Sequence, residues 1–238
     1  MDEHPSFLVF KHLERFLECR SLTPPVGIDF NTPRSRFITE LEHIGYYRLD
    51  AVTRPGDPAS AAYREKTVTI FVLALRGKYT EHAPHLRGLI ASLNSENFSR
   101  EKRLLEVIVV APEETMKKKN MTDVVKSFRA AAAAGGPTPG SLDGPTPAAE
   151  YYNMYPYHVF SLDIPRAQIV PRHTIVSPEK VQAFLARERL SRHDLPLIAS
   201  SNPPVVWIGG RPNQVICIEH ASETAGKAYV YCVVVFRA

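Results

Sequence analysis

Few residues in this 238-residue chain have the types and spacing that catalysis or phosphate binding requires. The triplet Ala225-Gly226-Lys227 resembles part of a phosphate-binding loop. Such a loop also needs a glycine five residues before Gly226 and a hydroxyl after the lysine, but Ala221 and Ala228 occupy these positions. No GxSxG nucleophile elbow is present either. The sequence therefore argues against both kinds of site.

Metal-dependent chemistry has equally weak candidates. Structural zinc needs several Cys and His ligands at short spacing, and His82 and His85 form only one pair. A metal-dependent nuclease needs carboxylates and a lysine that converge at a strand end. The adjacent Glu65 and Lys66 would point to opposite faces of a strand, with Asp57 as a distant companion. We expect no catalytic residue, metal site, cofactor or small-molecule substrate.

One segment carries most of the net charge of +4. Residues 115–129 hold five basic side chains and one acidic side chain. The basic residues are Lys117, Lys118, Lys119, Lys126 and Arg129. Such a run is typical of a solvated loop and helix start, and it also suits contact with a phosphate backbone. Because the rest of the chain is nearly neutral, a dedicated nucleic-acid binder is not indicated.

Composition indicates a globular intracellular protein. Hydrophobic residues make up 44% and charged residues 23% of the chain. No stretch approaches the roughly eighteen consecutive apolar residues of a membrane span, and the acidic start MDEHPSFLVF lacks the basic region of a secretory signal. Cys19, Cys217 and Cys232 form no CxxC pair, which favours reduced thiols.

Hydrophobic periodicity predicts the elements of the N-terminal part. The expected elements are helices over 7–19 and 34–46, a strand over 67–75, a helix from Pro84, a strand over 106–110 and a helix from Thr122 into the alanine run. A strand, a helix and a second strand in this order predict a parallel βαβ unit. We expect an α/β domain with a small mixed sheet flanked by helices.

An abrupt change of composition separates this part from the C-terminal part. Residues 130–149 are rich in Ala, Gly and Pro, which is typical of a flexible linker or insertion. Beyond them we expect a helix from Ser177 and Pro178, a turn over 191–196, a short apolar run over 205–208 and a hairpin of strands 214–220 and 228–236. The prediction is an α+β protein with domains 1–129 and 150–238.

Three ordered motifs in the C-terminal part carry a family resemblance. They are Val170, Pro171 and His173, then Leu195, Pro196 and Ile198, then Ser222 to Gly226. They resemble the L-V-P-x-H, L-P-x-I and P-S-E-T-A-G elements of the fifth subunit shared by eukaryotic nuclear RNA polymerases, whose C-terminal domain has an archaeal RNA polymerase subunit as its counterpart. The N-terminal part is similar to the jaw domain of that family only in the order of its elements.

The resemblance implies a non-catalytic, nuclear polymerase subunit, located in the nucleoplasm or nucleolus. Its C-terminal assembly domain would dock on the largest subunit, and its jaw domain would lie near downstream double-stranded DNA. The implied DNA-proximal residues are Thr115, Lys117, Lys118, Lys119 and Lys126. The implied interface residues are Val170, Pro171, His173, Leu195, Pro196, Ser222, Glu223, Thr224, Ala225 and Gly226. No membrane partner is expected.

The sequence departs from the family pattern at several positions. Leu197, His220 and Cys232 stand where the family usually has arginine, and the stretch Asn202–Trp207 replaces D-P-V-A-R-Y. The partner surface has therefore changed as well, which suggests a divergent lineage or a copy dedicated to one polymerase. Three other interpretations stay open: an independent DNA-binding or nuclease-like protein with the same C-terminal module, an adaptor outside polymerase, and a hairpin loop that only caps itself.

Overall fold

The computed structural model describes residues 4–53, 65–74, 83–96, 102–133, 151–222, 224 and 226–236. The chain forms two compact units, Met1–Ser161 and Leu162–Ala238. This corrects the expected domain start at 150, because the strand β5 (Tyr151–Pro156) belongs to the sheet of the first unit. Of the expected linker, residues 130–133 end a helix, and the rest lies outside the described residues.

The first unit contains a sheet of five strands in the order β1-β2-β3-β4-β5. Its strands are β1 (Leu22–Thr23), β2 (Tyr46–Thr53), β3 (Glu65–Leu73), β4 (Lys102–Ala111) and β5. Its helices are α1 (Pro5–Cys19), α2 (Arg34–Ile44), α4 (Ala83–Glu96), α5 (Glu113–Met116), α6 (Lys119–Ala133) and the 3-10 turn η2 (Tyr157–Phe160). β1, β2 and β3 pair antiparallel, whereas β3, β4 and β5 pair parallel. The predicted βαβ unit is therefore confirmed as β3-α4-β4.

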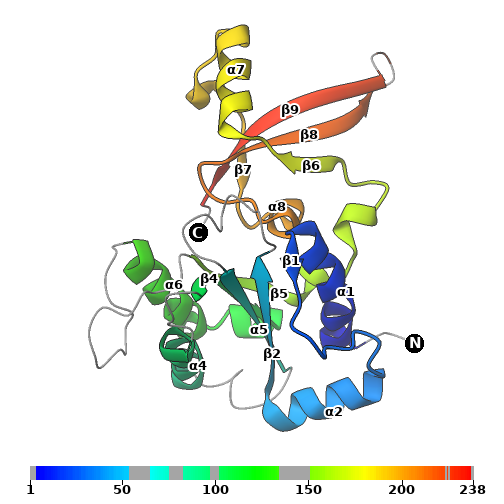
Figure 1. The fold of residues 1–238 in the computed structure, drawn as a ribbon, viewed down its shortest axis with the longest axis vertical. Coiled ribbons are helices and arrows are strands. Elements are labelled where there is room, and N and C mark those ends of the chain that lie inside the picture. The colour runs from blue at the N-terminus through cyan, green and yellow to red at the C-terminus, as the bar shows by residue number, and fades with distance from the viewer. Residues whose placement is uncertain are drawn as a thin grey trace. The chain divides into compact units, whose positions relative to one another are not determined.

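Helices cover the sheet of the first unit on both faces (Figure 1). On one face, Val107 of β4 and Phe71 of β3 join Leu86 and Ile90 of α4 and Phe128 of α6 in one buried cluster. On the other face, α1 packs near β3 and η2. Because both faces are covered, the whole EVIVV segment is buried, as its apolar sequence predicts.

The second unit contains a four-stranded sheet in the order β6-β8-β9-β7. Its strands are β6 (Arg172–Ile175), β7 (Leu197–Ala199), β8 (Val215–Ser222) and β9 (Gly226–Val235). Its helices are α7 (Pro178–Glu188), α8 (Pro203–Ile208) and the 3-10 turns η3 (Ile164–Arg166) and η4 (Arg192–Asp194). The predicted hairpin is confirmed, since β8 and β9 pair antiparallel from Val215 to Ser222. The α+β class is therefore confirmed for the protein as a whole.

Two small cores hold the second unit together. Val181 and Leu195 pack with Val215 and Val233 under α7, where the ring of Phe184 stacks on that of Tyr231 at 4.0 Å between centroids. Val205 of α8 packs with Ile216 and Val234 on the opposite face. Gly210 follows α8 so closely that a Cβ atom there would lie 2.6 Å from a Val205 methyl.

The start of α7 differs in detail from the prediction. Ser177 occupies the N-cap position with extended backbone, as expected, and Pro178 opens the helix. The Ser177 side chain makes no capping hydrogen bond to a backbone N–H. Hydrogen bonding by its own backbone N–H and by Ser177 at the start of the helix lowers the pKa of the Glu179 carboxyl.

Candidate functional sites

The β8–β9 hairpin extends beyond the rest of its sheet. β6 pairs only with Ile216–Glu219 of β8, and β7 pairs only with Val233–Val235 of β9. We call the outer part, Ile218–Ser222 and Gly226–Val230, the ribbon; β6 accompanies it only at Ile218 and Glu219, and its far end extends away from α7 in Figure 1. An isolated two-stranded hairpin is at best marginally stable in water. The ribbon is therefore a natural candidate for a surface that a partner covers.

One face of the ribbon is mainly apolar. Cross-strand pairing places Ile218, Val230 and His173 on the same face, followed by His220 and Ala228 further out. Val230 is 37% exposed, although valine on a strand normally faces a core. This apolar face continues the surface that α8 covers nearer the unit's core, where Ile218 packs against the α8 cluster.

The opposite face of the ribbon carries charges and tyrosines. Lys227 Nζ lies 2.6 Å from Glu219 Oε1, and this ion pair raises the pKa of Lys227. Tyr229 stands opposite Glu219 and is 54% exposed. Nearer the core, Tyr231 packs under Phe184 of α7. The two faces therefore differ, with charge confined to one of them.

The hairpin tip is only partly described. Gly226 starts β9 with φ of +70°, a left-handed conformation that glycine adopts without strain. The hydroxyls of Ser222 and Thr224 lie 3.4 Å apart, and the Thr224 side chain is exposed. Glu223 and Ala225, the other two predicted interface residues of this motif, lie outside the described residues. The Ser222–Thr224 contact supports some self-capping of the loop.

The first two motifs have mainly structural roles. Pro171 O accepts a hydrogen bond from His173 Nδ1 at 2.7 Å, and Val170 and Pro171 are half-buried. Leu195 is 6% exposed and lies in the core under α7, so its side chain packs inside the second unit, and its predicted place in a subunit interface stays a prediction. Pro196 is exposed, and its carbonyl accepts a hydrogen bond from Val233 N at 2.8 Å.

The environment of His173 makes a pH dependence testable. Burial lowers the pKa of His173 below its ordinary value of 6.5; the Pro171 carbonyl raises it, and nearby His220 lowers it further. The unfolded chain therefore binds a proton at a higher pH than the folded chain does. The contribution of His173 to the free energy of unfolding of the second unit should therefore be fully present above about pH 6.5. It should be lost as the pH falls below that value.

Urea unfolding of the second unit checks this expectation. The single tryptophan, Trp207, lies in α8 and reports on this unit by fluorescence. We expect a lower midpoint at about pH 5.5 than at about pH 7.5, and His173→Gln should reduce the difference. An unchanged difference in His173→Gln would show that other groups cause it.

The basic segment forms a surface of four lysines around the α5–α6 turn, which we call the lysine surface. Its members are Lys117, Lys118, Lys119 and Lys126, all exposed. Lys119 and Lys126 lie two turns apart on one side of α6, while Met121 and Phe128 of the same helix are buried in the core. Thr115 is only 3% exposed, so its side chain packs inside the first unit, and its predicted position near DNA stays a prediction.

Arg129 also departs from the predicted basic surface. Its Nε donates to Tyr152 O at 3.0 Å and its Nη2 donates to Asn153 Oδ1 at 3.2 Å. Burial lowers the pKa of Arg129. The guanidinium therefore ties α6 to the outer strand β5, and we leave it out of the lysine surface.

A buried polar network that the sequence analysis missed crosses the first unit. Arg20 Nη1 lies 2.8 Å from Glu106 Oε2, and both side chains are only 7% exposed. Asn153 Nδ2 donates to Glu106 Oε1 at 2.8 Å, and Arg20 also lies 4.6 Å from the ring centre of Phe16. Through Asn153 the network reaches Arg129. It joins the residue after α1 to β4, β5 and α6, and its signal in the sequence was the single carboxylate in the apolar EVIVV strand.

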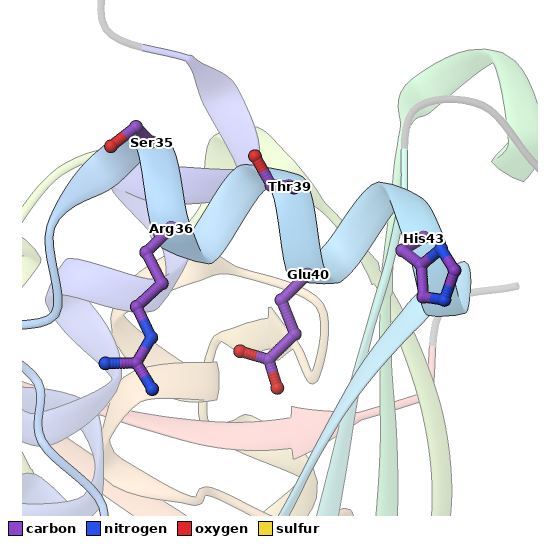
Figure 2. Close-up of a pocket in the computed structure, with 5 residues that line it drawn as sticks. All are labelled: Ser35, Arg36, Thr39, Glu40 and His43. Carbon is purple, nitrogen blue, oxygen red and sulfur yellow. The ribbon is translucent and has the colours of Figure 1, made fainter.

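Two surface hollows offer no catalytic arrangement. Figure 2 shows the side chains that line a hollow of about 520 Å³ along α2, all from that one helix. They are Ser35, Arg36, Thr39, Glu40 and His43. A groove of about 450 Å³ beside α7 is lined by Val181, Leu185, Arg192 and Val215 among others. Within these two sets, no hydroxyl is hydrogen-bonded to a histidine.

Other sequence-based candidates receive little support from the described parts of the chain. His82 and Asp57 lie outside them, as does the Glu65 side chain. No group of three or more His, Cys, Asp or Glu side chains that could hold a metal occurs within them. The helices described there include none long and apolar enough to cross a membrane.

Some known proteins match only a short part of this chain, and others match nearly all of it. The family described as RNA polymerase Rpb5, C-terminal domain, matches residues 162–234, which lie within the second unit. The DNA-directed RNA polymerase RPB5 homolog of African swine fever virus (isolate Pig/Kenya/KEN-50/1950) is 32% identical over 222 residues, which covers 93% of this chain and 93% of that protein. This similarity extends over both units.

Archaeal relatives match a shorter part. DNA-directed RNA polymerase subunit Rpo5 of Thermococcus celer is 41% identical over 73 residues, or 31% of this chain and 89% of that protein. The Rpo5 subunit of Pyrococcus abyssi (strain GE5 / Orsay) is 42% identical over 67 residues, or 28% of this chain and 82% of that protein. These matches cover most of each archaeal subunit but less than a third of this chain.

Proposed function

The chain belongs to the RPB5 family of DNA-directed RNA polymerase subunits, and from this premise we propose that it is a non-catalytic subunit whose second unit docks on the largest polymerase subunit. The observation that carries the proposal is the ribbon, where Val230 and Tyr229 are exposed on opposite faces of a hairpin whose outer part has no third strand beside it among the described residues. Because the chain belongs to this family, other polymerase subunits are its expected partners.

Docking would supply the burial that the ribbon lacks. Full burial of a valine or leucine side chain stabilises by about 1.5–3 kcal/mol relative to exposure. Val230, Leu197 and Tyr229 together would therefore form a useful apolar contribution to an interface. A permanent subunit contact is expected to bury more than roughly 1,000 Å² in total, so residues beyond the ribbon would join it.

Purification of the tagged chain at moderate salt tests this proposal. We expect both large polymerase subunits in near-stoichiometric amounts. Recovery of the chain alone, with duplex DNA retained or cut, would instead favour an independent DNA-binding or nuclease-like protein. Recovery with unrelated proteins would favour an adaptor outside polymerase.

We further propose that the lysine surface lies near downstream DNA in the assembled polymerase. Support comes from Lys117, Lys118, Lys119 and Lys126, which are all exposed around one turn of the first unit. Each lysine that neutralises a phosphate contributes roughly 0.9 to the log–log salt slope of duplex binding. The whole surface would contribute about 3.6, which suits a supporting contact rather than independent tight binding.

Removal of these charges should change the salt dependence of the polymerase. With all four lysines replaced by glutamine, we expect the slope for downstream duplex binding to become shallower by about 3 to 4. Lys180→Gln, on exposed α7 of the second unit, is the matched control and should leave the slope unchanged. If the fourfold variant had the same salt slope as the unmodified chain, the lysine surface would not contact the DNA.

The chain is also proposed to serve one dedicated polymerase. Support comes from its full-length similarity to viral homologues and from Leu197, His220 and Cys232 at positions where the family usually has arginine. Equal recovery with all three nuclear polymerases would contradict this. A nuclear location stays a prediction, and imaging that places the tagged chain and its polymerase in the cytoplasm would contradict it.

A further inference from the structure

Backbone groups of β9 point alternately to its two sides. Val233 N donates to Pro196 O at 2.8 Å, on the β7 side, whereas the next amide, Val234 N, donates to Gln214 O at 2.9 Å, on the β8 side. The period of a strand is two, so odd-numbered residues of β9 direct their N–H and C=O groups away from β8. The odd-numbered residues of the outer part are Lys227, Tyr229 and Tyr231.

No described strand lies beside these residues. The register of β7 on β9 begins at Leu197 opposite Val233, so β7 stops short of Tyr231. Figure 1 shows the far end of β9 running free of β7 and α7. The odd-numbered backbone groups from 227 to 231 therefore form an open sheet edge.

Soluble proteins usually protect such edges, and the first unit does so. Its outer strand β5 has the Tyr152 carbonyl covered by the Arg129 guanidinium at 3.0 Å. β9 contains no proline from Gly226 to Val235. A lysine can protect a strand edge, and Lys227 lies on this one. Its charge, however, is paired with Glu219 of the same sheet at 2.6 Å. The edge of β9 is therefore suited to accept another strand.

We propose that β9 accepts an extended segment of the largest polymerase subunit as an added strand along Lys227–Tyr231, an inference that rests on the proposed docking. The segment would carry apolar side chains on the side of Val230 and Ala228, because these residues form the apolar face. On the other side its residues would meet Tyr229, which favours aromatic or hydroxyl side chains. It would contain no proline where its own N–H groups pair with β9.

Strand addition also explains how docking tolerates the changed side chains. Main-chain hydrogen bonds supply affinity in this mode, while pockets for alternate side chains supply specificity. Leu197 is 68% exposed next to the open edge, at a position where the family usually has arginine. An apolar contact beside a backbone ladder would take over from a charge-assisted contact there.

A pair of substitutions at one position separates backbone from side-chain docking. Tyr229→Pro removes an outward N–H and leaves the bonds to β8, because Tyr229 points its N–H away from that strand. Tyr229→Ala keeps the N–H and removes the ring. We expect Tyr229→Pro to bind the largest subunit roughly tenfold or more weakly than Tyr229→Ala does. Equal binding of the two variants would overturn the proposal.

Hydrogen exchange of the unmodified chain gives a second test that needs no variant. In the free chain, amides of Tyr229 and Tyr231 should exchange rapidly, while those of Ala228 and Val230 are protected by β8. In the assembled polymerase, the odd-numbered amides should slow by roughly tenfold or more. Co-purification without this protection would overturn strand addition and leave docking intact, whereas failure to co-purify would overturn both.

Discussion

Val230→Asp should weaken retention of the largest polymerase subunit by roughly 100-fold or more, which corresponds to about 2.7 kcal/mol. Two effects add up at this position. The variant loses burial of the exposed third of the valine side chain, about 0.5 kcal/mol or more, and it places an unpaired carboxylate against an apolar contact, which costs several kcal/mol. The measurement is the dissociation constant of the chain for the largest subunit, or its recovery in a tagged purification.

Val26→Asp provides the matched control. Val26 is fully exposed in the first unit, so the same chemical change there should not alter retention. Unfolding followed by Trp207 fluorescence shows whether Val230→Asp keeps the second unit folded. Normal retention of a folded Val230→Asp chain would exclude the apolar face of the ribbon from the interface.

Glu106→Ala should destabilise the first unit by about 3–5 kcal/mol. The substitution leaves the Arg20 guanidinium buried at 7% exposure without its carboxylate, and Asn153 loses its acceptor. Attraction within a buried pair offsets the cost of desolvation, and a buried charge whose carboxylate is removed loses that attraction while it keeps the cost. Urea unfolding followed by far-UV circular dichroism measures the change.

An exposed ion pair in the same unit is the control. Arg15 and Glu18 lie 2.7 Å apart with 38% and 50% of their side chains exposed, so Glu18→Ala should cost less than about 1 kcal/mol. The Trp207 transition of the second unit should stay in place in both variants. If Glu106→Ala cost no more than Glu18→Ala, the network would have no special role in stability.

The parts of the fold that carry a local signal were predictable from the sequence. The βαβ unit combines two apolar, β-branched strands with a periodic helix, and the hairpin has two such strands around Gly226. The strands YYRLDAVT (β2) and YYNMYP (β5) were missed because they are only partly buried and mix polar with aromatic residues. These segments become strands because they pair with β3 and β4, and a local sequence pattern does not indicate such pairing.

The candidate sites were predictable only as segments. Leu195 and Thr115 were singled out together with their motifs, but their side chains are buried, since a motif does not reveal which way each residue faces. Glu106 and Arg20 are 86 positions apart, so their pairing could not be derived from spacing. A carboxylate inside an apolar strand still indicates that some buried partner must exist.

A photo-cross-link from position 229 tests the docking claim most directly. Tyr229 is aromatic and 54% exposed, so a photoreactive aromatic amino acid replaces it with little change of shape. After irradiation of the purified polymerase, the account predicts a covalent adduct between the chain and the largest subunit, at a segment of extended structure. Adducts with other subunits alone, or none from a chain that co-purifies in full amount, would contradict it.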